Sequence, residues 1–227
     1  MNTPLTGIRA CVFDAYGTLF DYASAAARCA DVPQALRERL NVLWREKQLQ
    51  YTWLRTLQGR HADFRQVTGD ALDFALETVG IDSRAVRERL MSLYLRLDAF
   101  PEVPQVLARL KAAGLKTAIL SNGSPEMLQA AVEHAKLGPL LDAVLSVEAV
   151  GVYKPHPKVY QLAVDRLGVA PRAIAFQSSN AWDAWGASAY GLSVVWCNRY
   201  AQRPERLPGG PDRQITSLTA LPALVGA

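Results

Sequence analysis

The 227-residue sequence has few side chains that bind metals and no long apolar run. Cys11, Cys29 and Cys197 are widely spaced, which argues against a disulfide framework and against a cysteine-based zinc site. The three histidines share no spacing typical of a metal site. No apolar segment reaches the roughly 20 residues of a membrane helix, and the first residues lack a signal-peptide pattern. We therefore expect a cytoplasmic protein without a metal, a cofactor or a membrane partner.

Charge of one sign is not concentrated anywhere along the chain. The formal net charge is +4, but arginines alternate with glutamates in segments such as 37–39 and 87–89. This pattern is typical of solvated helix faces, whereas nucleic-acid binding needs a clustered basic face. We expect a small anionic substrate rather than nucleic acid. Half of the residues are apolar, so the chain can bury a sizeable core.

Five short apolar runs predict the strands of a buried parallel sheet. They cover residues 8–13, 116–120, 143–147, 173–176 and 193–197. Helical patterns lie between them, at residues 103–113, 125–136, 157–167 and 181–190. Strands that alternate with helices of this length predict an α/β protein with a doubly wound, Rossmann-like parallel sheet.

One long stretch breaks this alternation. Between residues 21 and 98, helical patterns at 36–57, 70–79 and 84–97 follow one another without a convincing strand. We therefore predict a helical cap domain of residues 21–98, inserted after the first strand. The remaining residues, 1–20 and 99–227, would form the α/β core domain.

Polar clusters follow four of the predicted strands. They are Asp14 to Thr18, Ser121 to Gly123, Lys154-Pro155, and Ser178 to Asp183. A single aspartate at the end of a strand is usually a turn residue. Because the carboxyl ends of parallel strands meet at one edge of the sheet, these clusters should converge on one crevice.

In this order the clusters resemble the four motifs of the haloacid dehalogenase superfamily, and residues 21–98 stand where its members carry a helical cap. Its phosphatases have a second aspartate that protonates a departing alkoxide, but Tyr16 occupies that position here. Ser178-Ser179 replaces the Gly-Asp pair that helps those enzymes to bind Mg²⁺. A halide leaves as a stable anion, so its departure does not need the acid that Tyr16 replaces. The substitutions at Tyr16 and Ser178-Ser179, together with the cap segment 44–49, are similar to the L-2-haloacid dehalogenase branch.

This resemblance implies a covalent mechanism and no cofactor. Asp14 would attack the α-carbon of the substrate and form an ester that water later hydrolyses. Thr18 would orient the Asp14 carboxylate, and Lys154 would keep it ionised. Tyr160 and Asp183 resemble the partners of Lys154 in the family. The residues implied to position the hydrolytic water are Ser178, Asn180 and Asp183.

The resemblance also implies a binding site for a small L-2-haloacid and its halide product. Ser121 would hold the substrate carboxylate with neighbouring N–H groups, and Arg45 would reach down from the cap. Arg45 shares a helix face with Leu49 and Trp53. The implied halide cradle consists of Arg45, Asn122 and Trp182. The implied remainder of the substrate pocket consists of Ala15, Tyr16, Leu49, Phe64, Tyr160 and Trp182.

Two other functions stay open at this point. One is a magnesium-dependent phosphatase of the same superfamily, and the other is a catalytically inactive binding protein with this fold. The general base for ester hydrolysis is not identified by the sequence. Relatives are often dimers, so a homodimer is the assembly that the resemblance implies.

Overall fold

The computed structural model describes residues 4–22 and 29–227. Within them, six parallel strands form one sheet in the order β3-β2-β1-β4-β5-β6. The strands are β1 (Ala10–Phe13), β2 (Lys116–Ser121), β3 (Ala143–Ser146), β4 (Ile174–Ser178), β5 (Ser193–Cys197) and β6 (Arg213–Ile215). The predicted doubly wound parallel sheet is confirmed.

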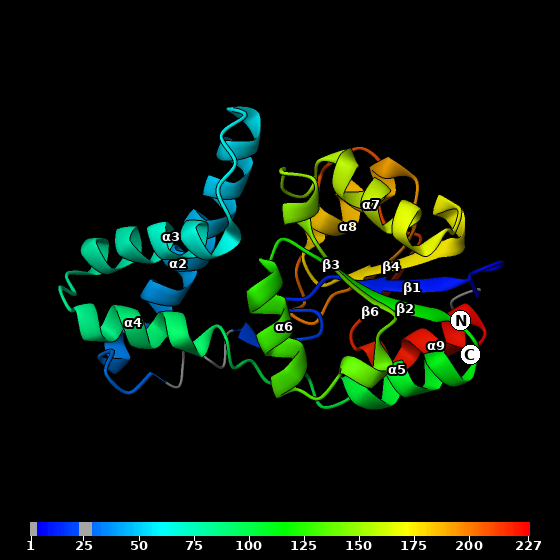
Figure 1. Ribbon diagram of the computed structural model, residues 1–227, viewed down its shortest axis with the longest axis horizontal. Helices are drawn as coiled ribbons and strands as arrows, with labels where there is room; N and C mark the ends of the chain where they lie inside the picture. The colour runs from blue at the N-terminus through cyan, green and yellow to red at the C-terminus, as the bar shows by residue number, and fades with distance from the viewer. Residues whose placement is uncertain (1–3, 23–28) are drawn as a thin grey trace.

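Helices cover both faces of the sheet, which explains why its central strands are buried and mostly apolar. Every residue of β1, β4 and β5 is buried. Figure 1 shows α7 (Pro157–Leu167) and α8 (Ala181–Tyr190) over one face, with α5 (Val103–Ala112) and α9 (Leu221–Val225) over the other. A further helix, α6 (Pro125–His134), packs beside the edge strand β3.

The cap is built from three helices between β1 and α5: α2 (Gln34–Leu57), α3 (Phe64–Val79) and α4 (Arg84–Leu93). Figure 1 shows them grouped to one side of the sheet. Helix α2 packs against α3. Its buried residues recur at every fourth position: Leu40, Trp44, Gln48 and Thr52. This buried stripe lies one position before the stripe of Arg45, Leu49 and Trp53, whose residues are only partly buried.

The two chain segments that join the cap to the core lie side by side. Phe20 forms an antiparallel bridge with Ala99, and the Asp21 N–H donates to the Asp98 carbonyl at 2.9 Å. The predicted boundaries at 20/21 and 98/99 fall at this junction. The division into two domains stays a prediction.

Several element boundaries differ from the predicted ones. Helix α3 begins at Phe64 rather than at residue 70, because the Asp63 carboxylate caps it by accepting the Gln66 N–H at 3.0 Å. Helix α4 ends at Leu93, and β6 and α9 were not predicted. Ser124 precedes α6 as expected, yet its hydroxyl makes no capping bond. Among the described helices, none has both the length and the apolarity needed to cross a bilayer.

Candidate active site

The strand order reverses between β1 and β4, and the candidate site lies at that point. From β1 the chain proceeds outward through β2 to β3, and then returns to β4 on the other side of β1. In an open parallel sheet, ligands bind in the crevice at such a reversal. Asp14 follows β1 here, and Ser178 is the last residue of β4.

Both oxygens of the Asp14 carboxylate accept hydrogen bonds. Oδ1 accepts from Lys154 Nζ at 3.0 Å. Oδ2 accepts from Asn180 Nδ2 at 2.8 Å and from the Thr18 hydroxyl at 3.3 Å. The Thr18 hydroxyl in turn accepts the Ser179 N–H at 2.8 Å, which ties the first motif to the fourth. Thr18, which was predicted to orient Asp14, and Lys154, which was predicted to keep it ionised, therefore contact its carboxylate.

A second buried carboxylate shares the Lys154 ammonium. Lys154 Nζ donates to Asp183 Oδ2 at 2.8 Å, and the Tyr160 hydroxyl donates to Asp183 Oδ1 at 2.8 Å. Tyr160 therefore contacts Asp183, and no direct bond between Tyr160 and Lys154 is found among the described residues. Burial acts to lower the pKa of Lys154, but Asp14 and Asp183 outweigh it and raise that pKa. Burial, helped by the charge of Asp14, raises the pKa of Asp183 against the opposing effect of Lys154.

Tyr16 lies in an aromatic cluster beside Asp14. Its ring stacks on Phe64, with centroids 5.8 Å apart, and lies 5.5 Å from the Tyr94 ring. Its hydroxyl is buried and has no hydrogen-bond partner among the described residues. A Cβ at Gly123 would come within 2.7 Å of this hydroxyl, so glycine is needed there. Burial, followed by Tyr94 and Asp14, raises the pKa of Tyr16 well above its ordinary value, so the phenol stays a hydrogen-bond donor.

The last residue of β2 is Ser121, and the loop that follows begins with Asn122. The Ser121 hydroxyl accepts the Gly123 N–H at 3.1 Å. The Asn122 side-chain oxygen accepts the Lys154 N–H at 3.0 Å. Only the NH₂ end of Asn122 can therefore serve as a donor to an anion. The predicted contacts of Ser121 and Asn122 with a ligand stay predictions.

Arg45 reaches from α2 in the cap to the core. Its Nη2 donates to Asn180 Oδ1 at 3.3 Å, and its Nη1 donates to Gln48 Oε1 at 2.6 Å. The guanidinium carbon lies 4.9 Å from the centre of the Tyr22 ring. Burial acts to lower the pKa of Arg45, but the nearby tyrosines and Asp14 raise it. Asn180 thus bridges the cap arginine and Asp14 through the two ends of one amide.

The remaining predicted residues lie around this centre. Ala15 is buried, and its carbonyl accepts the N–H groups of the turn that follows β1. The Ser178 hydroxyl accepts the Asn180 N–H at 3.2 Å, at the start of α8. Trp182, in the first turn of α8, lies edge-on to Trp53 with ring centroids 5.5 Å apart. Leu49 is partly buried on α2, and its contact with a substrate stays a prediction.

Three polar residues near Arg45 were not predicted. Gln48, Thr68 and Tyr94 are buried in the cap and are joined by hydrogen bonds. The available signal was the spacing of α2, because Gln48 interrupts the stripe of buried residues set by Leu40 and Trp44. A polar residue inside a buried stripe needs a partner.

The ionisable groups of the described residues form no cluster of three or more His, Cys, Asp or Glu suited to a metal ion. The ammonium of Lys154 lies between the two carboxylates of the site, 3.0 Å from Asp14 and 2.8 Å from Asp183. That activity needs no divalent cation stays a prediction.

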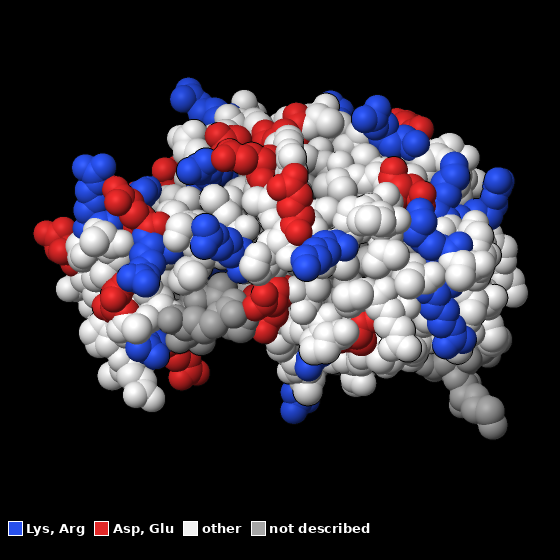
Figure 2. All heavy atoms as spheres, turned by 60° about the horizontal axis from the view of Figure 1, so that its bottom comes forward, with Lys and Arg blue, Asp and Glu red and all other residues white. Residues whose placement is uncertain are grey.

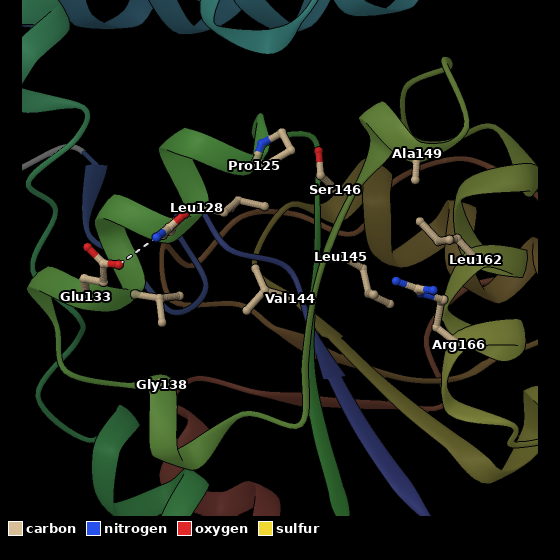
Figure 3. Close-up of a pocket in the computed structure, with 12 residues that line it drawn as sticks. Pro125, Leu128, Glu133, Gly138, Val144, Leu145, Ser146, Ala149, Leu162 and Arg166 are labelled. Atoms are coloured by element: carbon tan, nitrogen blue, oxygen red, sulfur yellow. Dashed lines mark hydrogen bonds between the residues drawn. The ribbon is translucent and has the colours of Figure 1, made fainter.

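The surface has two further features, a cavity outside this centre and a mixed distribution of charge. A cavity of about 660 Å³ lies between α6, α7 and the edge strand β3. Figure 3 shows Leu128 and Glu133 on one side of it and Leu162 and Arg166 on the other. Its lining contains none of the predicted site residues. Figure 2 shows acidic and basic side chains interspersed on the face that it presents.

Comparisons with known proteins identify the family of the chain. A family model described as haloacid dehalogenase-like hydrolase matches residues 8–191. "(S)-2-haloacid dehalogenase 4A" from Burkholderia cepacia is 49% identical over 215 residues, which cover 94% of this chain and 93% of that protein. A crystal structure described as that of a dehalogenase is 48% identical, with a TM-score of 0.95 and coverage of 98% of this chain and 99% of that one.

A third relative is described with a ligand. The L-2-haloacid dehalogenase from Xanthobacter autotrophicus, with chloropropionic acid covalently bound, is 41% identical to this chain. The TM-score is 0.89, and the match covers 96% of this chain and 98% of that one.

Proposed function

Because the chain belongs to the haloacid dehalogenase-like hydrolase family, we propose that it is an (S)-2-haloacid dehalogenase. Its substrates are small L-2-haloacids, and its products are D-2-hydroxyacids and halide. The similarity extends over nearly the whole chain in each relative named above. The magnesium-dependent phosphatase and the inactive binding protein are not favoured.

The first step is a displacement at carbon. One oxygen of the Asp14 carboxylate attacks the α-carbon in line with the carbon–halogen bond. A carbon–oxygen bond forms, and the halogen leaves with the bonding electron pair as halide. Lys154, Asn180 and Thr18 orient the attacking carboxylate. The covalent chloropropionic acid described for the Xanthobacter relative supports such an ester.

The second step regenerates Asp14. Water attacks the carboxyl carbon of the ester, and the bond between that carbon and the ester oxygen breaks. The hydroxyacid leaves with the original Asp14 oxygen and one proton of the water, and the second proton is released to solvent. Asp14 regains a carboxylate with one oxygen from water. Ser178, Asn180 and Asp183 are the residues proposed to position that water. The α-carbon is inverted once, in the first step.

The observation that carries this proposal is the bridge through Asn180. The same amide donates to Asp14 and accepts from Arg45. It therefore places the nucleophile and a positively charged donor beside one space. A guanidinium in that place stabilises the negative charge that develops on a departing halide. Two residues after Asp14, the chain has Tyr16 and not the carboxylic acid that would protonate a departing alkoxide.

Halide release tests the proposal. The purified protein is incubated with each enantiomer of 2-chloropropionate, and chloride is measured by ion chromatography. We expect chloride from the L-enantiomer and D-lactate as the organic product. A parallel assay measures phosphate release from a phosphate monoester with Mg²⁺. Phosphate release without chloride release would favour the phosphatase, and no release in either assay would favour the binding protein.

We also propose that the protein forms a homodimer through exposed apolar residues of α2 and α3. Val42, Leu54 and Leu57 on α2 and Phe74 on α3 are large apolar side chains exposed to solvent. Exposed apolar residues gathered on one pair of helices are typical of an interface. Light scattering of the purified protein should give the mass of two chains, and Leu57→Glu should shift it towards one.

A further inference from the structure

The guanidinium of Arg45 contacts uncharged groups. Its two guanidinium NH₂ groups donate to the amide oxygens of Gln48 and Asn180, and its face lies against the Tyr22 ring. Among residues 4–22 and 29–227, no carboxylate forms an ion pair with Arg45. Asp14 therefore acts on this charge only from a distance, without a direct ion pair.

Gln48 is the residue that fixes Arg45 within the cap. It is 1% exposed, and both ends of its amide are used. Oε1 accepts from Arg45 Nη1 at 2.6 Å, and Nε2 donates to the Thr68 hydroxyl at 2.8 Å. The Tyr94 hydroxyl also donates to Oε1, at 3.4 Å. The arginine on α2 is thereby linked to α3 and to the end of α4.

The direction of each bond in this chain is set by its neighbours. The Thr68 hydroxyl donates to the Phe64 carbonyl at 2.6 Å, so it is free to accept from Gln48. Gln48 must then turn its NH₂ group towards Thr68 and its oxygen towards Arg45. A guanidinium only donates, so it requires an acceptor there. Burying an amide is costly unless it is bonded, and a leucine would continue the apolar stripe of α2 at lower cost.

We propose that Gln48, held by Thr68, is a positioning residue for Arg45 and that its neutrality preserves the positive charge that meets the departing halide. This inference rests on the proposed dehalogenase function. Gln48 acts through Arg45 rather than on the substrate. A glutamate would give the same acceptor geometry but would neutralise the guanidinium. The choice of an amide at position 48 is therefore part of the halide site.

The first test replaces the amide by a carboxylate. Gln48→Glu retains the size of the side chain and the oxygen that accepts from Arg45, while adding a negative charge beside it. It also removes the NH₂ group that donates to Thr68, a loss that Thr68→Val measures separately. We expect the single-turnover rate with L-2-chloropropionate to fall about a hundredfold, as when one transition-state donor is lost. The loss should be smaller with L-2-bromopropionate. Chloride is the poorer leaving group and carries a more concentrated charge, so it depends more on the donor.

The second test weakens the link without changing charge. Thr68→Val removes the hydroxyl that accepts from Gln48 and retains the shape of the side chain, whereas Thr68→Ser retains the hydroxyl. We expect the rate to fall about tenfold in Thr68→Val, the loss of roughly one hydrogen bond, with most of it restored in Thr68→Ser. Thermal unfolding of each variant measures any general loss of structure.

The outcomes separate the two levels of the proposal. If the wild-type protein releases no halide, the proposed function fails and this inference fails with it. If the wild-type protein is active but Gln48→Glu matches its rates, the inference alone is overturned. It is also overturned if the chloride and bromide rates fall by equal factors in Gln48→Glu and Thr68→Val, because a structural defect lowers both alike.

Discussion

In the core half of the site Lys154 lies between Asp14 and Asp183, whereas in the cap half Arg45 contacts two neutral amides. The core cation is 1% exposed, and carboxylates neutralise its charge. The cap cation is partly buried, and no carboxylate among the described residues forms an ion pair with it. The difference indicates separate tasks. In the proposed mechanism, the core half holds the nucleophile in one orientation, and the cap half receives the leaving anion.

The largest expected effect comes from the nucleophile in the core. Asp14→Asn retains the shape of the side chain but replaces the anionic carboxylate by a neutral amide, which is a far weaker nucleophile. We expect turnover to fall by at least about 10⁴-fold, as for other nucleophiles that act as one unit with their partners. Halide release over hours, measured with enzyme in excess, checks this. A loss of only tenfold would mean that Asp14 is not the attacking group.

Removing the Lys154 ammonium should destabilise the folded protein as well as inactivate it. Lys154→Met leaves two buried carboxylates beside each other without a counter-charge. We expect a loss of about 3–5 kcal/mol in the free energy of unfolding, measured in urea. Asp183→Asn is the matched control, since it removes one carboxylate and leaves Lys154 paired with Asp14. Equal stability of wild type and Lys154→Met would contradict the claim that the Lys154 charge stabilises the fold.

The same pair of proteins has a defined pH dependence. The carboxylates raise the folded-state pKa of Lys154 above its ordinary value of 10.5. Its stabilising contribution is therefore fully present below about pH 10.5 and is lost as the pH rises through the folded-state pKa. The stability difference between wild type and Lys154→Met should be constant from about pH 8 to 10 and should shrink at higher pH. A difference that grows above pH 10.5 would contradict this.

The cap cation should matter for turnover and little for stability. Arg45→Lys retains the charge but loses the planar set of donors that reaches Gln48 and Asn180 together. We expect kcat for L-2-chloropropionate to fall by about 10- to 100-fold, near the range for a lost transition-state donor. The free energy of unfolding should change by less than about 1 kcal/mol. Wild-type turnover would show that Arg45 does not contact the halide.

The smallest expected effect is that of chelation. The ammonium of Lys154 faces the two site carboxylates, and Tyr16 and Ser178-Ser179 replace groups that a magnesium-dependent relative would use. Full activity should survive prolonged treatment with EDTA. A large loss of activity, reversed by added Mg²⁺, would mean that the core half depends on a divalent cation in addition to Lys154.

The core half of the site could be predicted almost entirely from the sequence. Asp14 and Asp183 follow the buried strands β1 and β4, and Lys154 follows the partly buried edge strand β3. The carboxyl ends of parallel strands bring such positions together. The edge of the sheet could not be predicted in the same way. Strand β6 has three residues, Arg213–Ile215, of which only Ile215 is buried, so it lacks an apolar run. Its pairing with β5 is a tertiary effect.

The cap half was only partly predictable. Arg45 could be predicted from the resemblance to the family. The residues that hold its side chain, however, are brought together by helix packing. Gln48 and Thr68 are 20 positions apart and lie on different helices. The start of α3 at Phe64 was missed because Val67, Thr68 and Gly69 have weak helix propensity. Packing against α2 holds this turn, and local sequence does not reveal such packing.

A single turnover in H₂¹⁸O tests most directly whether Asp14 attacks the substrate. With enzyme in excess over L-2-chloropropionate, solvent oxygen should enter the Asp14 carboxylate, and the new hydroxyl of the lactate should stay unlabelled. Mass spectrometry of the peptide that contains Asp14, and of the lactate, locates the label. Repeated turnovers should then carry ¹⁸O into the product. Label in the lactate hydroxyl after one turnover, with none on Asp14, would show that Asp14 only activates water and would contradict the covalent mechanism.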